Sequence, residues 1–336
     1  MAYPFERSAR DRFVLARRPR RLDANPWGAP AVVVEPELTA TGDLLDVATL
    51  FLIGRECPWR CVMCDLWQHT TARDTPLGAI PAQVRAGLAG LPSIPRVIKL
   101  YNAGSFFDPR AVPDDDYDGI AAALSGIEHV IVESHPALIG PRLDLWLSAL
   151  DSAFSGAPPR LETAIGLETA HPDALERINK RITVAQFESA AHALRSRGVG
   201  LRVFLLIAPP FVPPAEQDIW LRRSVDAAFD CGATAVSLIP TRSGNGAMEA
   251  LAAAGQFVPP TLEAVEAAFD ASLAGARGRV FLDLWDIERF AACECCGPSR
   301  IDRLRRMNAT QEPLPSAACA QCVRLDGMGA SIGRRS

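Results

Sequence analysis

The sequence predicts an α/β fold in which parallel strands form a barrel, between a partial (β/α)6 barrel and a full (β/α) barrel, with a Cys-rich C-terminal extension. Short apolar runs rich in β-branched residues alternate along the chain with stretches of helical periodicity. Six or more repeated units of this kind predict a parallel sheet that curls into a barrel. The length of 336 residues is enough to bury a large core.

The elements follow in chain order from the change of hydrophobic period along the sequence. The expected strands are Thr49–Gly54, Arg96–Tyr101, His129–Glu133, Leu161–Glu168, Gly200–Ile207, Thr234–Pro240 and Arg279–Trp285. The expected helices are Ala82–Leu91, Asp116–Leu124, Pro141–Phe154, Val184–Arg197, Glu216–Phe229 and Thr261–Ala274. Functional residues of such barrels collect at the C-terminal ends of the strands, so the residues after each strand are the candidates.

Three regions are expected along the chain. Residues 1–45 are rich in proline and arginine and are predicted to be an N-terminal extension that packs on the barrel. Residues 46–290 are predicted to form the barrel itself. Residues 291–336 hold most of the remaining cysteines and are predicted to be a metal-binding tail.

Composition and charge narrow the class of protein. Hydrophobic residues make up 49% and charged residues 22%, which is usual for a globular protein. The net charge of −4 gives no basic field that would attract nucleic acid. No apolar run is long enough to span a bilayer, and Met1–Arg21 lacks the apolar core of a secretory signal. We expect a cytoplasmic protein without a membrane partner, in which nine cysteines favour metal ligation over disulfides.

The strongest motif follows the first expected strand. Cys57, Cys61 and Cys64 have the spacing Cys-x3-Cys-x2-Cys on one short loop. Three thiolates can hold three irons of a 4Fe–4S cube and leave the fourth iron open to an outside ligand. The alternatives are a zinc knuckle, for which His69 is the candidate fourth ligand within a few residues, or three buried thiols.

The motif resembles that of the radical S-adenosylmethionine (SAM) superfamily at every cysteine position. The resemblance implies that Cys57, Cys61 and Cys64 bind a catalytic 4Fe–4S cluster with an open iron, which chelates SAM. It further implies that SAM is cleaved reductively to a 5′-deoxyadenosyl radical. A reductase with flavodoxin, or a ferredoxin, would then supply the electron.

Further cofactor-binding positions are expected at the ends of the second and third expected strands, the first of them from the resemblance and the other from its side-chain chemistry. A Gly-Gly-Glu-like turn, whose acidic side chain holds the SAM amino group in the superfamily, is replaced here by Asn102, Gly104 and Ser105. Glu133 and Ser134 follow the third strand and suit a ribose or an amine. The alternative for the first group is a plain turn that contains glycine.

A further set of cofactor positions resembles the branch that includes the Elongator catalytic subunit and the methylthiotransferases. There a glutamate helps to hold SAM and a later basic residue reaches its carboxylate, which implies Glu168 and Lys180, with Arg181 as the alternative base. A surface ion pair is the other interpretation. Pro209 is expected to line the adenine, and Met63 takes a position that is aromatic in most of the superfamily.

Four residues at the strand ends are candidates for contact with substrate. They are His135, Arg242, Asn245 and Asp283. Arg242 could hold a carboxylate or a phosphate through two hydrogen bonds, and Asp283 could accept a proton or orient the substrate. A surface turn is the alternative for Arg242 and Asn245.

The tail contains a second cysteine constellation. Cys293 and Cys296 form one Cys-x2-Cys pair, Cys319 and Cys322 form another, and Cys295 is a possible substitute ligand. The two pairs predict an auxiliary 4Fe–4S cluster or a zinc site. The arginine-rich segment between them, Ser299–Met307, could be a helix that meets a phosphate or a solvated face.

Segments near 98–109, 133–136 and 166–169 narrow the resemblance to the archaeosine-synthase radical SAM family and its bacterial relatives. That family implies C–N bond cleavage or rearrangement on a nucleoside-like or modified-base substrate. A sulfur-inserting radical SAM enzyme that uses the tail cluster as sulfide donor is one alternative, and a non-catalytic zinc-stabilised binding protein is another. A small molecule or nucleoside is the expected substrate, and the acidic net charge disfavours a whole tRNA.

Overall fold

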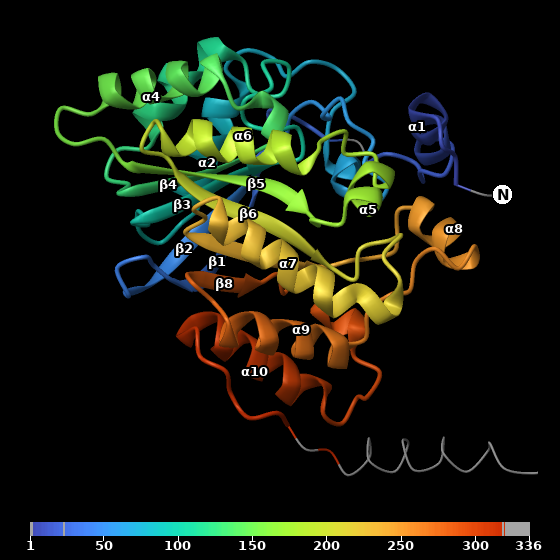
Figure 1. Ribbon diagram of the computed structural model, residues 1–336. Helices are drawn as coiled ribbons and strands as arrows, with labels where there is room; N and C mark the ends of the chain where they lie inside the picture. Colours follow the sequence, from blue (N-terminus) through green and yellow to red (C-terminus); the bar gives the residue numbers. More distant parts are fainter. Residues whose placement is uncertain (1–2, 23, 318, 320–336) are drawn as a thin grey trace, which may run out of the picture.

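A computed structural model describes residues 3–22, 24–317 and 319 of the chain. One eight-stranded sheet runs in the order β1 to β8, and every neighbouring pair is parallel except β1 and β2. The strands are β1 (Ala31–Leu38), β2 (Leu44–Leu52), β3 (Val97–Asn102), β4 (His129–Ser134), β5 (Arg160–Glu168), β6 (Gly200–Ile207), β7 (Ala235–Pro240) and β8 (Arg279–Leu282). The sheet curls into a nearly closed barrel, which confirms the predicted fold class (Figure 1).

Helices cover the outer face of the sheet and connect successive strands (Figure 1). The α-helices are α1 (Arg7–Leu15), α2 (Ala79–Ala89), α3 (Tyr117–Ala123), α4 (Pro141–Ala153), α5 (Pro172–Arg177), α6 (Val184–Arg195), α7 (Gln217–Asp230), α8 (Ala247–Ala253), α9 (Leu262–Ala274) and α10 (Gly297–Thr310). Every described helix is too short or too polar to cross a bilayer.

The expected strands all form, within a few residues of their predicted ends, but the sequence analysis missed β1. This strand pairs antiparallel with β2 at the edge of the sheet, where Pro36 lies opposite Asp46. A proline and two glutamates weaken the strand signal of this segment. An edge position tolerates a proline because its missing N–H is not needed by a second neighbour.

In the described chain no ladder pairs β1 with β8, which leaves a gap between these two strands. Helix α10 contacts both strands and covers this gap. Asn308 donates to the Leu282 carbonyl at 2.8 Å and accepts from the Leu282 N–H at 2.8 Å. Gln311 accepts from the Val280 N–H at 2.7 Å. The two side chains thus supply the free edge of β8 with partners that a strand would otherwise provide.

A buried ion cluster links strands from opposite sides of the barrel. Arg202 on β6 is only 1% exposed, and it pairs with Glu37 on β1 and, at 2.6 Å, with Glu162 on β5. Lys99 also pairs with Glu37, and Arg279 on β8 pairs with Glu162 at 3.4 Å. Burial alone would raise the pKa of Glu37, but Arg202 and Lys99 outweigh it and hold that pKa below its ordinary value.

Candidate functional site

The loop after β2 carries the three motif cysteines at the C-terminal end of the barrel. Cys57, Cys61 and Cys64 are all half-buried. The loop is fixed to the connection after α5, because the Val62 N–H donates to the Ile178 carbonyl at 2.9 Å. A fixed loop of this kind holds the three thiols in place before any ligand binds.

Asn245, after β7, braces the same loop from the other side. Its amide NH2 donates to the Val62 carbonyl at 2.7 Å and to the Cys64 carbonyl at 3.1 Å. Its amide oxygen accepts from the N–H groups of Ala247 and Met248 at the start of α8. The side chain is 3% exposed, so its contacts are with the cluster loop rather than with the open mouth of the barrel.

The environment of the three thiols opposes their ionisation. Burial raises the pKa of Cys57, raises that of Cys61 to about 12, and raises that of Cys64 well above its ordinary value. Lys180 lowers the pKa of Cys57 and Cys61, but less than burial raises it. A bound metal would reverse this balance, since thiolates are the ligands that iron and zinc require.

His135 lies beneath the cluster loop with both ring nitrogens engaged. Nδ1 accepts from the Ala137 N–H at 3.1 Å, so Nε2 carries the proton and donates to the Lys180 carbonyl at 3.0 Å. The ring stacks on Trp59, which lies between Cys57 and Cys61, with centroids 3.5 Å apart and planes 8° apart. Burial and Lys180 lower the pKa of His135 to about 3, so the ring is neutral.

The ends of β3 and β4 meet at Asn102 and Glu133. The Asn102 N–H donates to Glu133 Oε1 at 2.7 Å, and burial raises the pKa of Glu133 to about 8. The side-chain amide of Asn102 is 4% exposed, and neither its oxygen nor its nitrogen has a partner within the described chain. Leaving a buried amide unsatisfied costs about 1–3 kcal/mol, so this side chain is suited to a ligand.

Glu168 and Lys180 form a buried ion pair at the end of β5. The Lys180 ammonium donates to Glu168 Oε1, and both side chains are about one-tenth exposed. Glu168 has φ +67° where the β5 register shifts, and this turns its carboxylate toward Lys180. A Cβ at Gly166 would collide with both charged groups, so glycine makes room for the pair. Burial disfavours the ammonium, but Glu168 outweighs it and raises the pKa of Lys180.

Arg181 points away from this pair. Its guanidinium pairs with Asp11 on α1, and Asp11 also accepts from the Asn179 amide at 2.9 Å. Asn179 in turn donates to the Arg60 carbonyl of the cluster loop at 2.9 Å. Arg181 therefore fastens α1 to the loop that follows α5, while Lys180 is the basic residue that lies beside the cysteines.

The remaining candidates take supporting positions. Ser105 accepts from the His135 N–H at 3.0 Å, and Ser134 lies buried beside it. A Cβ at Gly104 would collide with the Arg55 carbonyl, so this glycine allows the β3 turn to pack on the cluster loop. Two candidates contact protein rather than open space: Met63 packs on the hydrophobic core and the Pro209 carbonyl accepts from Gln217.

Arg242 and Asp283 are brought together at the ends of β7 and β8. Arg242 Nη2 donates to Asp283 Oδ2 at 2.7 Å and to the Trp285 carbonyl at 2.5 Å. The Trp285 ring is 58% exposed and its centroid lies 6.0 Å from that of Phe51 on β2. These residues present a charged pair and an exposed aromatic face at the mouth of the barrel.

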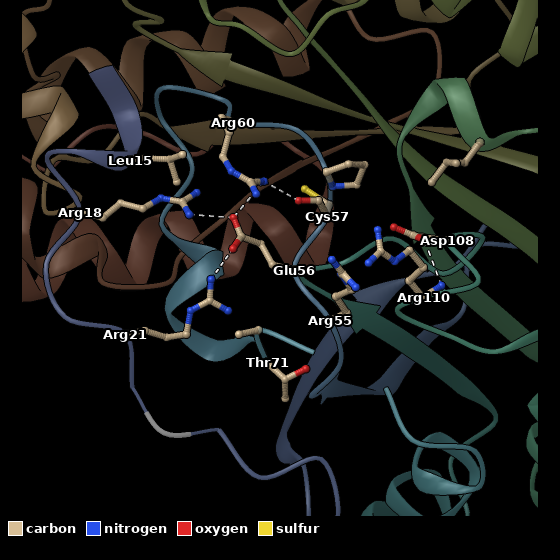
Figure 2. Close-up of a pocket in the computed structure, with 13 residues that line it drawn as sticks. Leu15, Arg18, Arg21, Arg55, Glu56, Cys57, Arg60, Thr71, Asp108 and Arg110 are labelled. Carbon is tan, nitrogen blue, oxygen red and sulfur yellow. Dashed lines mark hydrogen bonds and ion pairs between the residues drawn. The ribbon is translucent and has the colours of Figure 1, made fainter. Parts of the chain in front are cut away.

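An arginine-lined cavity of about 400 Å³ opens beside Cys57 (Figure 2). Five arginines line it, against two acidic residues, Glu56 and Asp108; the arginines are Arg18, Arg21, Arg55, Arg60 and Arg110. Three of these guanidiniums share the single Glu56 carboxylate, and the arginine at position 18 has its Nε buried without a partner within the described chain. Asp74, outside the lining, pairs with two more of them. The five arginines still outnumber the three carboxylates, so the cavity keeps an excess of positive charge.

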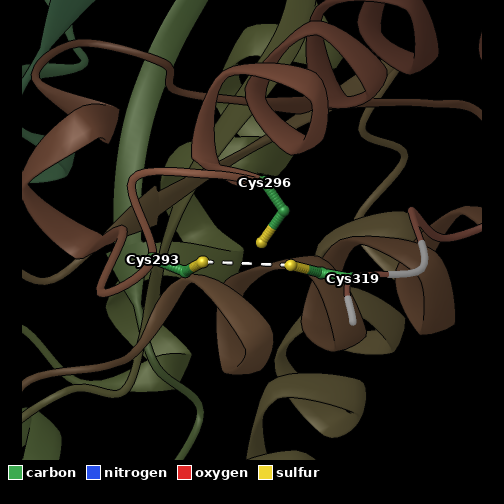
Figure 3. A group of neighbouring side chains, drawn as sticks. All are labelled: Cys293, Cys296 and Cys319. Atoms are coloured by element: carbon green, nitrogen blue, oxygen red, sulfur yellow. Dashed lines mark hydrogen bonds between the residues drawn. The ribbon is translucent and has the colours of Figure 1, made fainter. Parts of the chain in front are cut away.

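Three tail cysteines converge next to the start of α10 (Figure 3). The sulfur atoms of Cys293, Cys296 and Cys319 all lie within 4.8 Å of one another. Cys295 is exposed, and its thiol interacts with that of Cys319. Cys322 lies outside the described residues.

The arginines of α10 have a structural role at two positions. Arg300 pairs with Glu263 and Glu266 on α9, and Arg303 pairs with Glu266 and, at 2.7 Å, with Asp270. Both arginines are buried. These two side chains hold α10 on α9, so neither is available for a phosphate.

Several residues that shape the site were not predicted from the sequence. Trp59 lies inside the cysteine motif, where an aromatic residue could have suggested a stacking role. Asp11, Arg18 and Arg21 come from the N-terminal region and reach the cluster loop only through the fold. No local pattern in the sequence connects residues that far apart, so these contacts needed the structure.

Similar proteins are found by sequence and by fold. No protein-family model matches the chain. The sequence is similar to archaeosine synthase subunit beta of Methanosarcina acetivorans, with 27% identity over 318 residues, which cover 88% of this chain and 90% of that protein. It is also similar to the subunit of the same name from Thermococcus kodakarensis, with 28% identity over 35% of this chain and 36% of that protein.

The fold is similar to that of Elp3 from the archaeon Methanocaldococcus infernus, with a TM-score of 0.50 and 14% identity over 68% of this chain and 59% of that chain. A more distant structure is the radical SAM methyltransferase TsrM of Kitasatospora setae, with a TM-score of 0.40 and 16% identity over 55% of this chain and 35% of that chain. The expected resemblance to archaeosine synthase subunit beta is therefore confirmed by sequence, and the fold is that of Elp3.

Proposed function

We propose that this chain is a radical SAM enzyme that acts on a nucleoside-like or modified-base substrate and brings about C–N bond cleavage or rearrangement. One observation carries the proposal: the Cys-x3-Cys-x2-Cys loop lies at the C-terminal end of a parallel barrel, directly beside the buried Glu168–Lys180 pair. Active sites of such barrels lie at this end.

The residues at the barrel end fit the proposed cofactors. Cys57, Cys61 and Cys64 would hold three irons of a 4Fe–4S cluster. Lys180 would meet the carboxylate of SAM, and the unsatisfied amide of Asn102 would meet its amino group. When bound, the cluster and SAM supply a carbon radical that removes a hydrogen atom from the substrate.

Residues at the ends of β7 and β8 would form the part of the site that binds the substrate. Arg242 and Asp283 form a charged pair that can orient polar groups, and the exposed Trp285 ring can stack on a planar heterocycle. These features support a nucleobase better than an aliphatic substrate. The same region would hold the substrate against the cofactor and exclude water.

The experiment is anaerobic reconstitution followed by SAM and dithionite. We expect about four irons on the motif cysteines and release of 5′-deoxyadenosine. The C57A/C61A/C64A variant should release none, whereas C231S, which removes a thiol far from the site at the end of α7, should match the unmodified protein. No 5′-deoxyadenosine from fully reconstituted protein would contradict the enzyme proposal. Loss of sulfide during a single turnover would favour the sulfur-inserting alternative.

We further propose that the arginine-lined cavity beside Cys57 receives the acidic surface of a one-electron donor protein. The lining carries five guanidiniums and two carboxylates, and Cys57, a proposed cluster ligand, is itself part of the lining. Complementary charge speeds the encounter of two proteins and fixes their orientation. Because the cavity touches the cluster loop, a donor bound there would lie close to the iron.

Replacing Arg21 and Arg110 with glutamine is expected to slow the reaction driven by flavodoxin about tenfold at low salt, and less at high salt. The rate with dithionite should be unchanged, since a small reductant needs no docking surface. Arg96→Gln is the matched control because Arg96 lies just before β3, at the other end of the barrel, in an exposed pair with Glu128. Equal losses with both reductants would contradict the docking role.

A further inference from the structure

The two cysteine groups of this chain differ in their spacing. The tail sulfurs of Cys293, Cys296 and Cys319 all lie within 4.8 Å of one another, and those of Cys293 and Cys319 are 4.0 Å apart (Figure 3). In the described part of the chain, no other three cysteine, histidine or carboxylate ligand atoms are gathered this closely, and the three thiols of the cluster loop are more widely spread.

This difference separates two kinds of metal. Zinc–sulfur bonds of 2.3 Å in a tetrahedral site put the sulfurs about 3.8 Å apart. In a 4Fe–4S cube each thiolate binds a different iron and points away from the centre, which spreads the sulfurs much further apart. The spacing of the tail sulfurs therefore matches a single tetrahedral ion.

We infer that the tail binds one structural zinc ion through Cys293, Cys296 and Cys319, with Cys322 as the fourth ligand. Zinc prefers an all-thiolate tetrahedral site and has no redox chemistry. Cys322 follows Cys319 at Cys-x2-Cys spacing, matching the spacing of the first pair. Such a site neither relays electrons nor provides sulfide, so of the two metals that the sequence leaves open for the tail we infer zinc rather than an auxiliary cluster.

The position of the site gives it a mechanical role. Cys296 is the residue before α10, and Cys319 lies beyond the end of that helix. The same helix covers the open edge between β1 and β8 and supplies partners to β8 through Asn308 and Gln311. A zinc ion that joins the two flanking segments would hold α10 over the gap and stabilise barrel closure.

The test uses the C57A/C61A/C64A variant, taken through anaerobic reconstitution and analysed for iron, sulfide and zinc. We expect about one zinc and no iron per chain. About four irons with matching sulfide would overturn the inference, because these could only be held by the tail. The readout is metal content, so it stands apart from whether the unmodified protein cleaves SAM.

Single variants test the ligand set. C296S and C322S should lose the zinc, and C231S and C295S should keep it. Retention of zinc by C322S with loss in C295S would overturn the fourth ligand. Should C296S fail to fold, the C57A/C61A/C64A variant provides a second measurement: a mercurial thiol reagent should release about one zinc per chain, and release of iron would overturn the proposal.

Discussion

Lys180→Met is expected to weaken SAM binding by at least about tenfold, which corresponds to ~1.4 kcal/mol, and to stop 5′-deoxyadenosine formation. The ammonium of Lys180 is buried beside Glu168 and close enough to Cys57 and Cys61 to lower the pKa of both. Its removal takes away the proposed partner of the SAM carboxylate. It also leaves the Glu168 carboxylate buried without compensation, which repels a carboxylate ligand.

The measurement is equilibrium dialysis of labelled SAM with the reconstituted protein, and an iron count on the same samples shows whether the cluster is intact. Arg181→Met is the matched control, because its guanidinium pairs with Asp11 on α1 rather than with Glu168. We expect this control to bind SAM as the unmodified protein does. Weak binding in the Arg181 variant, with normal binding in the Lys180 variant, would assign the role to the other base.

The sequence predicted the parallel barrel because hydrophobic period and loop length are local properties. It also predicted which residues follow each strand, and parallel strands bring those residues to one end. The sequence did not decide which of Lys180 and Arg181 is the base expected to reach the SAM carboxylate. Both neighbours carry a positive charge, and the direction of each side chain depends on the folded loop, in which Arg181 has a positive φ of 63°.

The structure of the N-terminal region was predicted less well from the sequence. Residues 1–45 were expected to be an extension that packs on the barrel, but they contain both α1 and β1, and β1 is a strand of the sheet itself. Arg18 and Arg21 contact Glu56 in the cluster loop, about 35 residues further along the chain. Contacts between arginines and carboxylates so far apart leave no periodic signal.

Strand β1 also contributes to the stability of the barrel. Glu37 places a carboxylate from this edge strand against Arg202, a residue of β6 on the other side of the barrel. The N-terminal region therefore contributes a charge to the buried ion cluster as well as a strand to the sheet. The integrity of the barrel then depends on a pair of residues 165 positions apart in the sequence.

Arg202→Met is expected to lower the free energy of unfolding by about 3 kcal/mol, because it leaves Glu37 and Glu162 buried with fewer partners. Lys99 and Arg279 remain beside the two carboxylates and keep the loss at the lower end of the range for a broken buried pair. Urea unfolding followed by tryptophan fluorescence measures the effect. Arg96→Met, which breaks the exposed Glu128 pair, should leave the midpoint close to that of the unmodified protein.

The pH dependence of unfolding provides an independent test of the same cluster. The pKa values of Glu37 and Glu162 are lowered in the folded state, where burial is outweighed by Arg202 and its neighbours. Their contribution to stability is therefore complete above the ordinary glutamate pKa of 4.5 and is lost as the pH falls toward the folded values. We expect the unmodified protein to lose stability in this acid range and Arg202→Met to lose less. Parallel pH profiles for the two proteins would show that Arg202 does not set the ionisation of these carboxylates.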